Sequence, residues 1–144
     1  MKVIIAAAGT GGHINPGIAI ANKIKQEEPN SEIIFIGTNR GLENDLVPRA
    51  GYELKQIEAY GLRKNIIKNL KTFKGIFQAR KIIKEVKPDV VIGMGGYISG
   101  PVILAAYMEK IPAQILSYRP RWLECLPPQC LSRRFRWLRY CIAV

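Results

Sequence analysis

The sequence predicts one α/β domain, a parallel sheet with flanking helices. Three observations support this prediction. Short apolar runs alternate with segments of helical periodicity throughout residues 1–112. Two of these runs end in glycine-rich loops, and 48% of the 144 residues are hydrophobic. That length and composition are sufficient for a packed core.

The expected elements follow one another in strict alternation, which favours parallel strands joined by right-handed crossovers. In order, they are a strand over 2–8, a helix from the Pro16 region to Pro29, a strand over 32–36, a short helix over 41–50, a strand over 54–57, a long helix over 65–86 with a break near Gly75, a strand over 90–92, a helix over 102–108 and a strand beginning at 111–112.

The two glycine loops, residues 9–12 and 93–101, each follow a predicted strand and open a helix. In a parallel sheet both loops would lie at the carboxyl edge, where ligands bind. Glycine lets the backbone approach an anion, and a helix N-terminus supplies N–H groups. The loops therefore indicate a phosphate or diphosphate cradle, although tight strand-to-helix turns would look alike. Neither a GxGxxG fingerprint nor a P-loop is present in the first loop.

His13 is the only histidine of the chain and directly follows the first glycine loop. At the rim of that loop an imidazole could bind a phosphate or act as a general base. A histidine that caps the helix or packs under the loop is the structural alternative.

The formal net charge of +11 favours an acidic partner, either nucleic acid, anionic lipid or phosphate, or else reflects a solvated basic surface. No apolar run approaches the ~20 residues that span a bilayer. The first eight residues lack the features of a signal peptide, so a cytoplasmic protein is expected. The three cysteines form no CxxC pair, and we predict no metal site and no cofactor.

Residues 66–76 carry an apolar stripe bordered by lysines, which could lie on an anionic membrane or pack in the core. Phe77, Ile82, Ile83 and Val86 are expected to form the core face of the same helix. The predicted membrane face consists of Lys64, Ile66, Lys68, Leu70, Lys71, Phe73, Lys74 and Ile76.

Several motifs together resemble the MurG family of N-acetylglucosamine transferases over about residues 1–112. The matching segments are Gly9-Thr10-Gly11-Gly12-His13-Ile14-Asn15-Pro16-Gly17, Gly37-Thr38-Asn39-Arg40-Gly41-Leu42-Glu43, Leu46-Val47-Pro48, Gly61-Leu62-Arg63-Lys64 and Gly95-Gly96-Tyr97-Ile98-Ser99-Gly100-Pro101. The resemblance implies the Rossmann-like, acceptor-binding, amino-terminal half of a GT-B glycosyltransferase.

The family's reaction transfers N-acetylglucosamine from UDP-N-acetylglucosamine to lipid I, inverts the anomeric centre and requires no bound metal. The resemblance implies a peripheral protein on the cytoplasmic face of the bacterial membrane. It makes His13 a candidate catalytic base or phosphate contact. The implied donor contacts are Thr10, Gly11 and Gly12, and the implied contacts to the acceptor diphosphate are Gly95, Gly96, Tyr97 and Ser99.

Residues 113–144 depart from the family. All three cysteines, both tryptophans and six arginines lie there, without a lysine, whereas residues 1–112 hold twelve lysines and four arginines. The family's His-Glu-Gln-Asn segment is replaced by residues 117–120, and its donor-binding domain is missing. A frameshift would explain this tail.

Three functions are compatible with these features. The first is a glycosyltransferase part that is inactive alone, and the second is a membrane-docking subunit that recruits a separate donor-binding partner. A nucleic-acid-binding protein is the third. It has support only from charge and from the alternating basic and aromatic residues 134–140, so we predict no nucleic acid partner.

Overall fold

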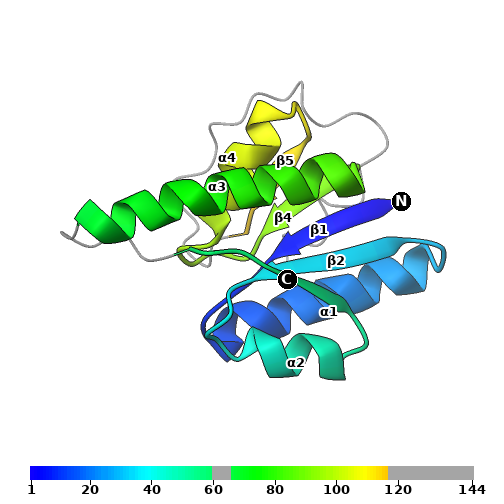
Figure 1. Ribbon diagram of the computed structural model, residues 1–144. Coiled ribbons are helices and arrows are strands. Elements are labelled where there is room, and N and C mark those ends of the chain that lie inside the picture. Colours follow the sequence, from blue (N-terminus) through cyan, green and yellow to red (C-terminus); the bar gives the residue numbers. More distant parts are fainter. Residues whose placement is uncertain (60–65, 117–144) are drawn as a thin grey trace.

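The computed structural model describes residues 1–59 and 66–116, and the side chains of 66–73 fall outside that description. In the described part, five parallel strands form one sheet in the order β3-β2-β1-β4-β5 (Figure 1). The strands are β1 (Lys2–Ala6), β2 (Glu32–Gly37), β3 (Glu53–Gln56), β4 (Val90–Gly93) and β5 (Ala113–Ile115). The predicted parallel sheet is confirmed.

Helices cover both faces of the sheet (Figure 1). They are α1 (Gly11–Glu27), α2 (Glu43–Arg49), α3 (Ile66–Val86) and α4 (Ser99–Met108). Helices α1 and α2 lie on one face, and α3 and α4 lie on the other, where they pack against each other. The sheet is thus the middle of three layers.

Strand β1 at the centre of the sheet supplies both cores, because successive side chains of a strand point to opposite faces. Val3 and Ile5 pack with the residues of α1, whereas Ile4 and Ala6 pack with those of α3 and α4. All four side chains are fully buried. A run that is apolar on both faces is typical of a central parallel strand.

The strand order places both glycine loops at one end of the sheet. From β1 the chain moves outward to β2 and β3 on one side, and later to β4 and β5 on the other. The carboxyl ends of β1 and β4 therefore flank the point where the winding reverses, which is where open α/β sheets bind ligands. The predicted location of the two loops at one edge is confirmed.

Helix α3 continues without interruption through Gly75, so the predicted break at that residue is wrong. A Cβ atom at Gly75 would lie 2.1 Å from the backbone oxygen of Glu58. Glycine is present there because the helix approaches the segment after β3. That contact is reinforced by Gln78, whose Oε1 accepts the Glu58 N–H at 2.7 Å, and by a 2.8 Å ion pair between Lys74 and Glu58.

Two neighbouring residues of α3 exchange the environments that we predicted for them. Ile76, expected on the membrane face, is half-buried and packs against the core cluster shared by α3 and α4. Phe77, expected in the core, is 65% exposed. Ile83 and Val86 are buried as predicted, and Ile82 packs against the same cluster. The helix is rotated relative to the predicted stripe because its core face is set by Ala79 and Ile83.

The sheet extends past residue 112, since β5 pairs with β4 through Ala113, Gln114 and Ile115. The predictions about the atypical tail fall on residues 117–144, outside the described residues, and stay predictions. In the described part of the chain, none of the helices has the length and apolar character needed to cross a bilayer.

Candidate functional site

The first glycine loop connects β1 to α1 and exposes the start of that helix. Thr10 precedes the helix in an extended conformation, and its side chain makes no capping hydrogen bond. The first N–H groups of a helix have no partner within the helix itself. At Thr10, Gly11 and Gly12 the loop therefore presents backbone donors and the positive end of a helix dipole. Thr10 and Gly12 are exposed.

The second glycine loop connects β4 to α4 through two residues in the left-handed region. Gly95 and Gly96 have φ values of +87° and +75°, which L side chains rarely adopt. Ser99 begins α4, and its hydroxyl donates a 2.7 Å hydrogen bond to the Gly95 carbonyl oxygen. Because Ser99 is only 3% exposed, its hydroxyl shapes the loop from inside.

His13 joins the two loops. Its Nδ1–H donates a 2.8 Å hydrogen bond to the backbone carbonyl of Met94, which lies 81 residues away in sequence. A carbonyl oxygen can only accept, so in the neutral ring the proton is on Nδ1 and Nε2 keeps its lone pair. The ring lies against the second loop, because a Cβ at Gly95 would stand 3.2 Å from its Cε1. The site therefore holds an oriented imidazole between two sets of backbone donors.

Tyr97 completes the arrangement from the second loop. A Cβ atom on Gly9 would lie 3.8 Å from the Tyr97 Cε1 atom, so the ring reaches across to the first loop. Tyr97 remains 39% exposed. Thr10, Gly11, Gly12 and His13 thus lie at the same edge as Gly95, Gly96, Tyr97 and Ser99, as the sequence predicts.

A buried carboxylate that the sequence analysis did not single out lies under the first loop. Glu43, the first residue of α2, is fully buried. Its Oε2 accepts the Gly9 N–H at 2.9 Å, and its Oε1 accepts the Thr38 N–H at 2.9 Å and the Thr38 hydroxyl at 2.7 Å. Burial alone would raise the pKa of Glu43, but these hydrogen bonds outweigh it and hold that pKa below its ordinary value.

The predicted membrane face is only partly within the described side chains. Lys64 lies outside the described residues, and Ile66, Lys68, Leu70, Lys71 and Phe73 belong to the segment whose side chains are not described. Lys74 is exposed and paired with Glu58. Other large apolar side chains are exposed on the same layer of helices, namely Phe77 on α3 and Leu104, Tyr107 and Met108 on α4.

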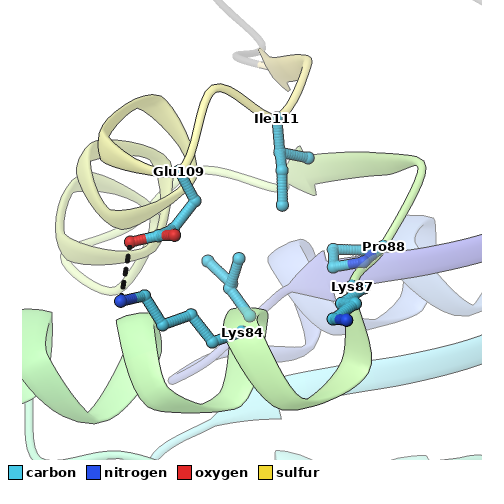
Figure 2. Close-up of a pocket in the computed structure, with 6 residues that line it drawn as sticks. Lys84, Lys87, Pro88, Glu109 and Ile111 are labelled. Carbon is cyan, nitrogen blue, oxygen red and sulfur yellow. Dashed lines mark ion pairs between the residues drawn. The ribbon is translucent and has the colours of Figure 1, made fainter.

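A surface pocket lies at the opposite edge of the sheet and is separate from the glycine loops. Figure 2 shows Lys84, Lys87, Pro88, Glu109 and Ile111 around it, with an ion pair of 3.6 Å between Lys84 and Glu109. Pro88 and Ile111 lie two residues before the first residues of β4 and β5, so the pocket opens at the amino ends of these strands. A hydrogen bond from Arg80 holds the pKa of Glu109 below its ordinary value. Within residues 1–59 and 66–116, no group of three or more potential metal ligands comes together.

The comparison with known proteins agrees with this architecture. Residues 3–115 match the glycosyltransferase family 28 N-terminal domain. The chain belongs to this family. The match confirms the resemblance that the two glycine loops predict, and it extends to the end of β5.

Two curated relatives share one enzyme name with each other. The chain is 52% identical over 120 residues to the UDP-N-acetylglucosamine–N-acetylmuramyl-(pentapeptide) pyrophosphoryl-undecaprenol N-acetylglucosamine transferase of Clostridioides difficile, covering 80% of this chain and 29% of the relative. It is 50% identical over 120 residues to the enzyme of that name from Lactococcus lactis subsp. cremoris, covering 80% of this chain and 34% of the relative.

A solved structure supports the fold assignment. The crystal structure of MurG from Acinetobacter baumannii matches with a TM-score of 0.70 and 35% identity, over 79% of this chain and 34% of that chain. This confirms the Rossmann-like fold of the amino-terminal half of a GT-B glycosyltransferase. The chain spans about a third of the length of the relatives that it matches.

Proposed function

We propose that this chain is the acceptor-binding part of an inverting glycosyltransferase that transfers N-acetylglucosamine from UDP-N-acetylglucosamine to lipid I. The product would be lipid II, which places the reaction in peptidoglycan synthesis and so in cell wall biogenesis, cell shape and cell division. The names of the relatives, at about 50% identity, support this reaction. These 144 residues span about a third of the length of the relatives, so in isolation they are expected to be inactive.

The observation that best supports this proposal is the hydrogen bond from His13 Nδ1–H to the Met94 carbonyl. It fixes the ring between the loops with Nε2 available to accept a proton. Transfer of a sugar to a hydroxyl requires a base that removes the proton of that hydroxyl as the new bond forms. We assign this role to His13.

The backbone groups of the two loops suit the charges of the two substrates. We assign Thr10, Gly11 and Gly12 to the donor, whose diphosphate would meet the N-terminus of α1. We assign Gly95, Gly96 and Tyr97 to the diphosphate of the acceptor, with Ser99 supporting that loop through its bond to Gly95. No residue of either set needs a metal ion for this role.

A chimaera tests the reaction. Residues 1–115 of this chain are fused to the remaining part of the Clostridioides difficile relative, and N-acetylglucosamine transfer to a lipid I analogue is measured. The chimaera should turn over, and His13→Ala should lower its rate by roughly 10²-fold or more. If the His13→Ala chimaera turns over within a few-fold of the unmutated chimaera, the role of His13 is contradicted. Turnover by the isolated 144-residue chain would contradict its predicted inactivity.

The outer surface of the α3–α4 layer is the part that we propose to lie on the anionic cytoplasmic membrane surface. It exposes Phe77, Leu104, Tyr107 and Met108. Lys74, Lys81 and Lys84 of α3 are exposed as well. Apolar side chains bordered by lysines can insert shallowly into an anionic leaflet.

Vesicle binding tests this surface. The parent should bind anionic vesicles, more weakly at high salt because salt screens the lysines. Phe77→Ser combined with Tyr107→Ser should remove the salt-resistant part of binding, since both side chains project from the domain. Leu42→Ser is the matched control, because Leu42 is also exposed but precedes α2 on the other face. Equal losses in control and variant would contradict the assignment.

A further inference from the structure

We propose that Glu43 is a positioning residue, whose buried carboxylate fixes the first glycine loop and, through it, the place of His13 and of the N–H groups at the start of α1. The contacts that define this restraint belong to the fold itself. Its consequence for ligand binding rests on the function proposed above.

The space around Glu43 is built for this side chain. A Cβ atom on Gly41 would stand 1.9 Å from the Glu43 Oε2, and a Cβ on Gly37 would stand 2.7 Å from its Cγ. Any larger residue at either position would displace the carboxylate. The two glycines, which lie between β2 and α2 or at the end of β2, therefore leave the Glu43 side chain room to reach Gly9 in the loop between β1 and α1.

The partners of Glu43 require a carboxylate rather than an amide. Both of its oxygens face donors, namely two backbone N–H groups and the hydroxyl of Thr38. A glutamine has nearly the same shape but carries one oxygen and one NH₂ group. Its NH₂ would meet the N–H of either Gly9 or Thr38, so one of these two donors would lose its acceptor.

The restraint acts on the residue that sets the course of the loop. Gly9 has a φ of +94°, and its N–H points inward to Glu43. The chain then turns into α1, and four residues after Gly9 the ring of His13 is fixed to Met94. The segment that presents Thr10, Gly11 and Gly12 is thus held at both ends, at Gly9 by a charge and at His13 by a carbonyl.

The sign of the effect on anion binding separates positioning from simple electrostatics. Loss of a negative charge near an anion site should tighten anion binding on Coulombic grounds alone. If Glu43 positions the loop, Glu43→Gln should instead weaken the binding of inorganic pyrophosphate by about tenfold, because the donors are no longer held in place.

The experiment uses the chain as it exists and follows assigned amide and imidazole signals by NMR. In the parent, the Gly9 amide should exchange with solvent about tenfold or more slowly than that of Gly12, since it donates to a buried carboxylate. In Glu43→Gln the Gly9 amide signal should move upfield. At about pH 9, where an ordinary imidazole is neutral, the ¹⁵N shifts of His13 should change from one tautomer to a mixture.

Thr38→Val is the matched control, since it removes one donor to Glu43 and keeps the bond to Gly9. It should leave the Gly9 and His13 signals as in the parent. The proposal would be overturned if the Glu43→Gln protein kept the His13 tautomer of the parent and the parent's rates of amide exchange at Gly11 and Gly12. If that variant does not fold, rapid Gly9 exchange in the parent would overturn it as well. If the parent does not bind pyrophosphate, the proposed function is contradicted. The NMR signals of the ligand-free proteins would still decide whether Glu43 positions the loop.

Discussion

The two glycine loops lie at the same edge of the sheet but are held by different kinds of contact. The second loop is closed locally, by a neutral hydrogen bond from Ser99 to Gly95, four residues apart. The first loop is closed from a distance, by a buried carboxylate on Glu43 that lies 34 residues beyond Gly9. The bond that closes the second loop lies within the sequence motif of that loop. The residue that closes the first loop lies outside the motif of the first loop.

This difference has a physical consequence. A neutral hydrogen bond contributes about 1 kcal/mol and does not depend on pH near neutrality, whereas bonds to a buried charge are stronger and require its ionised form. The first loop, with the proposed donor contacts, should therefore depend more strongly on one side chain than the second.

The largest effect is expected from Glu43→Gln, which leaves the N–H of Gly9 or that of Thr38 without an acceptor. An unsatisfied buried donor costs about 1–3 kcal/mol, and a bond to a charged group contributes about as much, so we expect a loss of about 3 kcal/mol in the free energy of unfolding. Urea denaturation measures it. A loss below about 1 kcal/mol would mean that the two loops are held equally well.

The same carboxylate makes a specific prediction about pH. The pKa of Glu43 is lowered in the folded state, so the group stabilises the fold above its unfolded pKa of 4.5. That contribution should disappear as pH falls from 4.5 through the lower pKa of the folded state. The difference in unfolding free energy between the parent and Glu43→Gln isolates it, since the other carboxylates are common to both. A difference that stays constant down to acid unfolding would contradict the prediction.

The contrast also explains how far the sequence could be interpreted. The alternation of strands and helices, the meeting of the glycine loops and the position of His13 follow from local patterns and from the geometry of parallel sheets. Glu43 was missed because an acidic residue at the start of a helix is common for electrostatic reasons alone. Its partner Gly9 becomes its neighbour only after β1 and β2 pair.

The errors in α3 have the same origin. Gly75 suggested a break because glycine is a poor helix former, yet it is required by the approach of the Glu58 carbonyl. Ile76 and Phe77 were exchanged because both are apolar and adjacent, so periodicity alone cannot decide which one faces the core. That choice is made by packing against α4 and the sheet.

Gly75→Ala tests the restraint imposed from a distance at α3. Its methyl group would stand 2.1 Å from a backbone oxygen, so the helix or the segment after β3 must shift, at a cost of about 2 kcal/mol. Gly100→Ala is the matched control in α4, since the added Cβ would meet no atom within 4 Å beyond its chain neighbours and the backbone of its own helix. It should stabilise the fold by up to about 1 kcal/mol through helix propensity. Thermal unfolding of both variants measures the contrast, and a stabilised Gly75→Ala protein would refute the close contact.

The smallest loss is expected from Ser99→Ala, which removes the local restraint of the second loop. The Gly95 carbonyl loses a 2.7 Å bond from a buried hydroxyl, and the cost should be about 1 kcal/mol. Ser99 and Glu43 share no hydrogen-bonding partner among the described residues, so their effects should add within about 0.5 kcal/mol in the double variant. A larger coupling in urea denaturation would show that the bond from His13 to Met94 joins the loops into one cooperative unit. In that case the two glycine loops would differ in where their restraining residues lie in the sequence, but not in how independently they are held in the folded site.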